Sequence, residues 1–328
     1  MPLAVEQAAA YLAQTCITPA AYLDLLARFP ARMLTATGEG GDAGRTMARV
    51  WHVTLDRLAD TPLAGTLLRQ LAWYAPDAIP RTLLAGAAEE PDLLDALRRL
   101  AAYSMITLTA DAISVHRVVQ AVTRAPDPTE PHRQPEDITT ARDAATTSLA
   151  EAIDGHDYLL PVSWPRYQTV LPHTQALLDH TTPDTHTPTT CRLLDQLGLY
   201  LADQGSIATA VTYFTHASRG YEDLLGADHP DTLSSRNNVA HAYELAGDLG
   251  RAISLYEATL ADRERVLGLD HPATLVSRND LAGAYESAGD LGRAIALFEA
   301  TLTDCERILG QDHPTTKTVR SNLASLTD

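Results

Sequence analysis

The stretch that decides the fold is Gly226–Leu267, which reads GADHPDTLSSRNNVAHAYELAGDLGRAISLYEATLADRERVL, and Gly268–Leu309 repeats it at once. The two 42-residue stretches agree at 30 positions, and both carry the run Ala-Gly-Asp-Leu-Gly-Arg-Ala-Ile, at 246–253 and 288–295. Self-similarity at a fixed period of this length is the signature of a repeat protein. We therefore expect one structural unit for every 42 residues.

Each unit has the pattern of two helices. Thr232–Leu245 places its apolar residues on one side of a helix, and Gly247 with the following aspartate then breaks the pattern. Leu249–Leu267 places its apolar residues at steps of three and four, which predicts a second helix that Gly268 closes. Pro230 fits the first turn of a helix. Each unit is therefore expected to be a helix pair.

The tripeptide Asp-His-Pro occurs at 228–230, 270–272 and 312–314, which raises the alternative of a metal site. Equivalent loops of neighbouring units are expected to lie about 10 Å apart, too far for their histidines to share one ion. The three cysteines also lack zinc-type spacing. We interpret Asp-His-Pro as a turn and a helix start and expect no metal.

Ala240, Tyr243, Ala252 and Tyr256 stand at offsets that resemble the tetratricopeptide pattern, in the 42-residue form found in kinesin light chains. The resemblance implies a right-handed α-solenoid over 189–328, with a degenerate first pair, two clear pairs and a lone last helix near 315–327. It also implies that the first helices of the pairs line a groove that binds a protein or peptide. The candidate groove residues are Asn237, His241, Glu244, Asn279 and Glu286, and each of them could instead be an ordinary solvated polar residue.

Residues 46–125 predict a different domain. Helical patterns occupy Thr46–Leu58, Leu63–Tyr74 and Asp92–Tyr103, two short strands follow at Met105–Thr109 and Ile113–Val115, and His116–Arg124 is again helical. Three helices and a small β-hairpin are typical of a winged helix, in a chain that is otherwise mainly α. The helix before the hairpin offers only Arg98 and Arg99 as cations, so binding of nucleic acid is not expected.

The composition excludes several classes of protein. The net charge is −17, and Lys317 is the one lysine, so no Gly-Lys-Ser/Thr phosphate loop stands in these residues. No arrangement of nucleophile and base is evident, and we predict a protein that is not an enzyme. No run of about 18 apolar residues predicts a membrane span, and the first residues do not resemble a secretory signal, so we expect a cytoplasmic location.

The order of the parts resembles the C-terminal portion of a bacterial NB-ARC-type signal-transduction ATPase of the STAND class. In that family a Gly-Leu-Pro-Leu motif lies beside the nucleotide, and Pro2-Leu3 matches its second half. A Met-His-Asp motif ends the family's winged helix, and His116 matches its histidine, although Val115 and Arg117 replace its neighbours. The resemblance implies that Pro2 and His116 face a nucleotide. ADP or ATP is expected only if a P-loop domain is supplied elsewhere.

These inferences divide the chain into a helical segment at 1–45, a winged helix at 46–125, a linker with two docking helices at 126–188 and the repeats at 189–328. The leading hypothesis is a non-catalytic regulatory module whose repeats bind a protein partner and whose other domains couple binding to an NTPase domain. The alternative is a transcription regulator with a winged helix on DNA and a repeat sensor. A third possibility is a chain with no independent role.

Overall fold

The computed structural model describes residues 12, 17–28, 56 and 60–327, and the contacts divide the chain into two units. Unit 1 comprises Met1–Asp154 and Gln168–Thr181, and unit 2 comprises Gly155–Tyr167 and Thr182–Asp328. No helix among the described residues is both long and apolar enough to cross a membrane. Pro2 and nearly all of the predicted helix Thr46–Leu58 lie outside the described residues.

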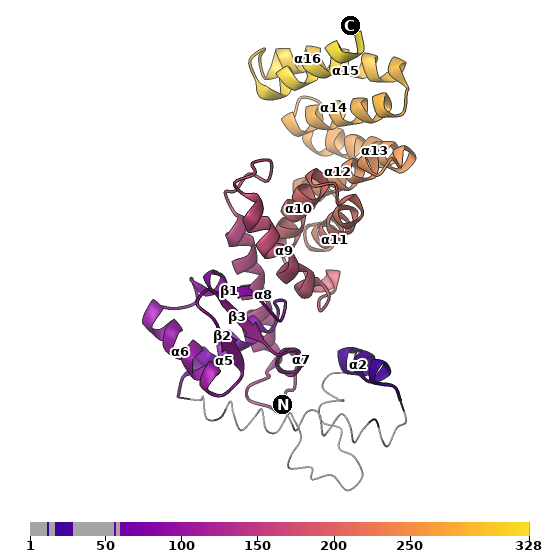
Figure 1. The fold of residues 1–328 in the computed structure, drawn as a ribbon. Helices are drawn as coiled ribbons and strands as arrows, with labels where there is room; N and C mark the ends of the chain where they lie inside the picture. The colour runs from indigo at the N-terminus through magenta and orange to yellow at the C-terminus, as the bar shows by residue number, and fades with distance from the viewer. Residues whose placement is uncertain (1–11, 13–16, 29–55, 57–59, 328) are drawn as a thin grey trace. The chain divides into compact units, whose positions relative to one another are not determined.

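Unit 1 combines helices with one small sheet (Figure 1). Its core comes from apolar residues of α5, α6, the strands and α7. Its elements are α2 (Pro19–Arg28), α5 (Pro62–Leu71), β1 (Ile79–Pro80), the 3-10 helix η2 (Arg81–Leu84), α6 (Glu90–Ala102), β2 (Ile106–Leu108), β3 (Ala112–Val115), α7 (Arg117–Arg124) and α8 (Pro135–Ile153). Helix α9 (Trp164–Leu178) begins in unit 2 and ends in unit 1.

The sheet is antiparallel with the strand order β1-β3-β2. Strands β2 and β3 form the predicted hairpin, with Ile106 opposite Val115. Strand β1 was not predicted, because two residues that end in Pro80 show no alternation that a sequence pattern could detect. The region therefore holds a three-stranded sheet, and its identity as a winged helix stays a prediction.

Helix α8 belongs to unit 1. Gln70 Nε2 on α5 donates to Ser148 Oγ (3.1 Å), and Tyr74 Oη donates to the carbonyl oxygen of Ala145 (3.4 Å). The predicted boundaries placed this helix in a separate segment at 126–188, docked under the repeats. The apolar face of α8 can be found from its sequence, but which core that face joins cannot.

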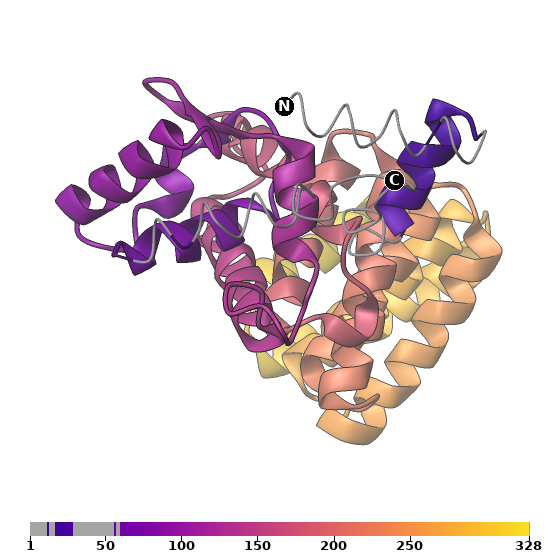
Figure 2. The ribbon, with the colours of Figure 1, turned by 90° about the horizontal axis from the view of Figure 1, so that it is seen from below.

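Unit 2 is a succession of helix pairs (Figures 1 and 2). The short 3-10 helix η3 (Pro183–Thr185) precedes them. The pairs are α10 (Pro188–Asp203) with α11 (Ile207–Leu225), α12 (Pro230–Leu245) with α13 (Leu249–Leu267), and α14 (Pro272–Ser287) with α15 (Leu291–Ile308), and α16 (Pro314–Thr327) follows. The structure confirms that the predicted helix pairs and the lone last helix exist as helices.

The Asp-His-Pro motif is a helix start in all three copies, as predicted. The histidine Nδ1 accepts the backbone N–H two residues ahead at 3.2 Å, and the proline occupies the first turn. The threonine two residues after each proline donates to the carbonyl oxygen of the preceding positive-φ glycine, in the pairs Thr232–Gly226, Thr274–Gly268 and Thr316–Gly310. Asp228 and Asp270 complete the turn through ion pairs with Arg265 (2.5 Å) and Arg307 (2.8 Å).

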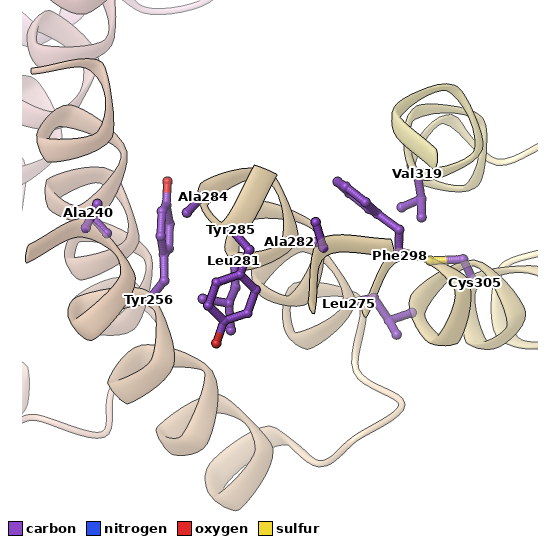
Figure 3. Close-up of a cluster of buried hydrophobic side chains, with 12 residues drawn as sticks. Ala240, Tyr256, Leu275, Leu281, Ala282, Ala284, Tyr285, Phe298, Cys305 and Val319 are labelled. Carbon is purple, nitrogen blue, oxygen red and sulfur yellow. The ribbon is translucent and has the colours of Figure 1, made fainter. Parts of the chain in front are cut away.

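An aromatic residue of each second helix packs against a small residue of the first helix of its own pair. Figure 3 shows Tyr256 of α13 between Ala240 of α12 and Ala284 of α14. Phe298 of α15 lies 42 residues later beside Ala282. In the first pair the contact is closer still, because a Cβ on Gly198 would stand 2.5 Å from the ring of Phe214. Burial of these rings supplies the apolar contact that joins one pair to the next.

The tight contact at Gly198 predicts the effect of adding one methyl group. We expect Gly198→Ala to lower the free energy of unfolding by about 1–3 kcal/mol, because Phe214 must move. Gly283 is the matched control: it also lies within a first helix, but a Cβ added there would meet no atom within 4 Å. Gly283→Ala should raise the free energy of unfolding by about 0.5–1 kcal/mol through helix propensity.

Thermal and urea unfolding followed by circular dichroism measure both changes. If the two alanine variants shifted the unfolding midpoint in the same direction, the contact between Gly198 and Phe214 would not be a tight one.

Candidate functional site

The first helices of successive pairs are joined by a ladder of polar side chains. Its three rungs link residues 43 positions apart: Asp195 with Asn238 (3.3 Å), Asn237 with Asp280 (2.8 Å) and Asn279 with Asn322 (3.0 Å). Two serines support it from positions 40 residues later, because Ser235 Oγ donates to Asp195 (3.0 Å) and Ser277 Oγ donates to Asn237 (3.3 Å). We call these eight residues the polar ladder. Its bonds fix which side of α10, α12, α14 and α16 faces the neighbouring first helix.

Two of the five predicted groove residues are members of this ladder. Asn237 donates to Asp280 through Nδ2, and Asn279 accepts from Asn322 through Oδ1. The amides thus join neighbouring helices, a role that the sequence-based interpretation did not include. An Asn amide has two N–H groups and two acceptor lone pairs, so each of them retains capacity for a further bond.

The remaining three lie one or two turns further along the same helices, His241 one turn after Asn237, and Glu244 and Glu286 two turns after Asn237 and Asn279. Glu244 accepts from Ser287 Oγ (2.9 Å) and from Tyr256 Oη (3.2 Å), and His241 Nδ1 is 3.9 Å from its carboxylate. Burial acts to raise the pKa of Glu244, but the bonds from His241, Ser287 and Tyr256 outweigh burial and lower it. Glu244 is therefore an ionised carboxylate held in place. Glu286 is half-buried at the matching position of α14.

We call the side of α12 and α14 that carries His241, Glu244 and Glu286 the first-helix face. Leu245 and Val276 are large apolar residues on these helices, and 46% and 38% of their surfaces are exposed. By helical periodicity both fall on the same side as the three polar residues. The face thus combines exposed apolar groups with polar groups, which is the composition of surfaces that contact other proteins.

The arginines of these helices point the other way. Arg236 of α12 pairs with Glu222 (3.1 Å) and Asp262 (3.3 Å) on second helices, and Arg278 of α14 does the same with Glu264 (2.8 Å) and Asp304 (3.0 Å). Neither helix has another arginine or a lysine. Glu244 and Glu286 therefore lie on a face of α12 and α14 to which these two helices contribute no permanent cation.

Two ladder aspartates are half-buried, and their removal from water raises their pKa values. For Asp195 burial outweighs the bonds from Asn238 and Ser235 and raises the pKa to about 7. The pKa of Asp280 is raised for the same reason, against the bonds from Asn237 and Asn279. The guanidinium of Arg263 on α13 also contacts the ladder, because it donates to Ser277 Oγ (2.6 Å), and it donates to the nearby Ser234 Oγ (3.1 Å).

The structure places His116, the predicted nucleotide-facing residue, at the N-cap of α7. Its Nδ1 accepts the N–H of Val118 (3.2 Å), which is the same role that the histidines of Asp-His-Pro have. Its exposed ring lines a pocket together with Pro76, Asp77, Thr107, Ser114, Val115 and Arg117. Pro2 lies outside the described residues. The nucleotide-facing role of both stays a prediction.

The ladder residues Asp195, Ser235, Asn238, Ser277, Asp280 and Asn322 were missed from the sequence. A signal for them exists, because polar residues recur with the period of the repeat two and three positions before each small residue, as in Asn237-Asn238 before Ala240 and Asn279-Asp280 before Ala282. What the sequence lacks is the offset between neighbouring pairs, which brings a residue beside the one 43 positions later and not beside its own counterpart.

Comparison with known proteins identifies the repeats. The family model described as "Tetratricopeptide repeat" matches residues 189–265 and 237–303. A nucleotide-binding leucine-rich repeat (NLR)-like protein of Hyaloscypha variabilis is 30% identical over 257 residues, which are 72% of this chain and 24% of the relative. The chain thus spans about a quarter of the length of that curated relative. The C-terminal part of the chain consists of tetratricopeptide repeats, a type of repeat that typically mediates contacts between proteins.

Two solved structures are similar at low scores. The nearly identical TPR-like repeats of a Podosopora anserina protein match with a TM-score of 0.43 at 21% identity, over 57% of this chain and 85% of that one. A STAND protein with a tetratricopeptide repeat sensor from Pyrococcus horikoshii matches with a TM-score of 0.26 at 13% identity, over 80% of this chain and 53% of that one. Similarity at these scores adds no argument about function.

The raised pKa of the half-buried Asp195 predicts a pH dependence of stability. Because its folded-state pKa of about 7 is above its unfolded value, the folded chain holds the proton more tightly, and its contribution to stability is lost as the pH rises from about 4 through 7. Each rise of one pH unit in this window lowers the free energy of unfolding by at most about 1.4 kcal/mol through this group. Asparagine can accept the same bonds from Ser235 and Asn238 without titrating.

We therefore expect Asp195→Asn to be stabilised relative to the unchanged protein at pH 8, with a smaller difference at pH 5. Unfolding midpoints of both proteins at the two pH values measure this. Equal differences at pH 5 and pH 8 would show that Asp195 does not titrate in this window.

Proposed function

We propose that this chain is a non-catalytic regulatory module in which the tetratricopeptide repeats bind a protein or peptide partner. The observation that carries the proposal is the first-helix face, where Glu244 is held ionised by hydrogen bonds beside the exposed Leu245. Side chains that are already fixed lose little conformational entropy when a partner binds. The match of residues 189–303 to the tetratricopeptide repeat family supports the same function.

We further propose that the module is the sensor part of a STAND-type signalling protein. The support is the identity of 30% over 257 residues with a relative whose name describes it as nucleotide-binding and NLR-like. In such a protein, binding of a partner to the repeats would be coupled through unit 1 to an NTPase domain. ADP or ATP would bind only with a P-loop domain, and His116 is the residue of this chain that we assign to the nucleotide side.

The test is whether the first-helix face contributes to the affinity for a partner. The full chain is immobilised, a bound protein is captured from extract of the cells that make it and identified, and its affinity is then measured by titration. We expect Glu286→Lys to weaken binding tenfold or more, about 1.4 kcal/mol, because it reverses a charge on the face.

Glu299→Lys is the matched control, since it makes the same change at an exposed position of the second helix α15. It should change the affinity less than about twofold, as expected for a charge outside the contact. Equal losses in the two variants would place binding elsewhere, and a chain that captures no specific protein would contradict the function itself.

A further inference from the structure

A second feature of the repeats lies at the turn between α12 and α13, away from the first-helix face. An open pocket there is lined by Tyr243, Asp248, Gly250, Arg251, Ser254 and Leu255. The guanidinium of Arg251 lies over the ring of Tyr243, 4.3 Å from its centroid, and pairs with Asp248 (2.5 Å). An aromatic hydroxyl and an arginine thus border one open space.

The next pair contains the same arrangement, but with one more group. Arg293 lies over the ring of Tyr285, 4.2 Å from its centroid, and pairs with Asp290 (2.5 Å). Here Tyr285 Oη also donates to the carboxylate of Glu257, which reaches across from the second helix of the preceding pair (2.7 Å). Figure 3 shows this hydroxyl pointing in the opposite direction to that of the core tyrosine Tyr256. A tyrosine and an arginine in this geometry therefore accommodate a carboxylate.

The first site lacks this carboxylate. The residue 42 positions before Glu257 is Thr215, whose short side chain donates to the carbonyl oxygen of Val211 in its own helix (2.7 Å). The two tyrosines differ accordingly in exposure: Tyr285 is buried, with 8% of its surface exposed, whereas Tyr243 is half-buried. Tyr243 thus borders an open pocket, whereas the equivalent Tyr285 donates to a glutamate of the preceding second helix.

We propose that the pocket at Tyr243 and Arg251 binds the carboxylate of a glutamate or aspartate side chain on the protein partner. The Tyr243 hydroxyl would donate to the carboxylate, as the Tyr285 hydroxyl donates to Glu257, and the positive charge of Arg251 would favour the bound anion. That a protein carries the carboxylate rests on the proposed function. The preference of the pocket for a carboxylate does not, and a small probe tests it alone.

The probe is N-acetyl-glutamate N-methylamide, with the glutamine analogue as the neutral comparison. It is titrated at constant ionic strength into the full chain labelled with 13C at the tyrosine rings, and the Tyr243 signal is assigned with Tyr243→Phe. We expect the glutamate probe to shift the Tyr243 ring signal with a dissociation constant on the order of 10 mM, as suits one charge-assisted hydrogen bond. The glutamine probe should not shift it, and the Tyr285 signal should respond to neither.

Two reciprocal variants make the test specific. Thr215→Glu would supply the carboxylate internally and should abolish the response of Tyr243. Glu257→Thr would open the second site, and the signal of Tyr285 should then respond to the glutamate probe. Circular dichroism confirms that both variants remain folded.

An unchanged response in Thr215→Glu, or equal responses to the two probes, would overturn the proposal. So would the absence of any response in the unchanged protein. None of these outcomes bears on capture of a partner by the first-helix face, so a failure of this inference and a failure of the proposed function can be told apart.

Discussion

The contact on which the repeats depend is that of an aromatic ring with the backbone of the neighbouring first helix. Phe214, Tyr256 and Phe298 each lie at the same position of a second helix, and each is buried. Gly198, Ala240 and Ala282 provide the small positions that they meet. Tyr256 also packs against Ala284 of the next pair, and across the same boundary between pairs Asn237 donates a hydrogen bond to Asp280. Apolar packing and the polar ladder thus act together where one helix pair meets the next.

What could be predicted from the sequence is what depends on local order along the chain. The helix pairs follow from periodicity and from the glycines, and the role of Asp-His-Pro follows from the chemistry of helix starts. The residues of the first-helix face could be named because they share one side of a helix. Asn237 and Asn279 were named as well, but their bonds to Asp280 and Asn322 depend on how two helices are offset, which no single repeat encodes.

The same distinction between local and long-range order explains where unit 1 differs from the sequence-based prediction. Strand β1 exists because Ile79 finds a partner in Ile113, 34 residues later, and not because its own two residues favour a strand. Helix α8 was found from its pattern, but its assignment to a unit depends on contacts such as the one between Gln70 and Ser148. His116 was singled out for a family motif, whereas the structure shows it capping α7, which any histidine in this position could do.

The rungs of the ladder join residues 43 apart, and the helix pairs recur every 42 residues. The spacing of each bond therefore follows from the repeat and is the same wherever the repeat stands in the chain. When one whole 42-residue block is duplicated or lost, the helices that become neighbours carry, at the ladder positions, the residues equivalent to those of the former neighbours. In evolution such a protein can change its length by unequal recombination without first inventing a new interface between helices. The number of contact positions offered to a partner can thus vary while the packing rule stays the same.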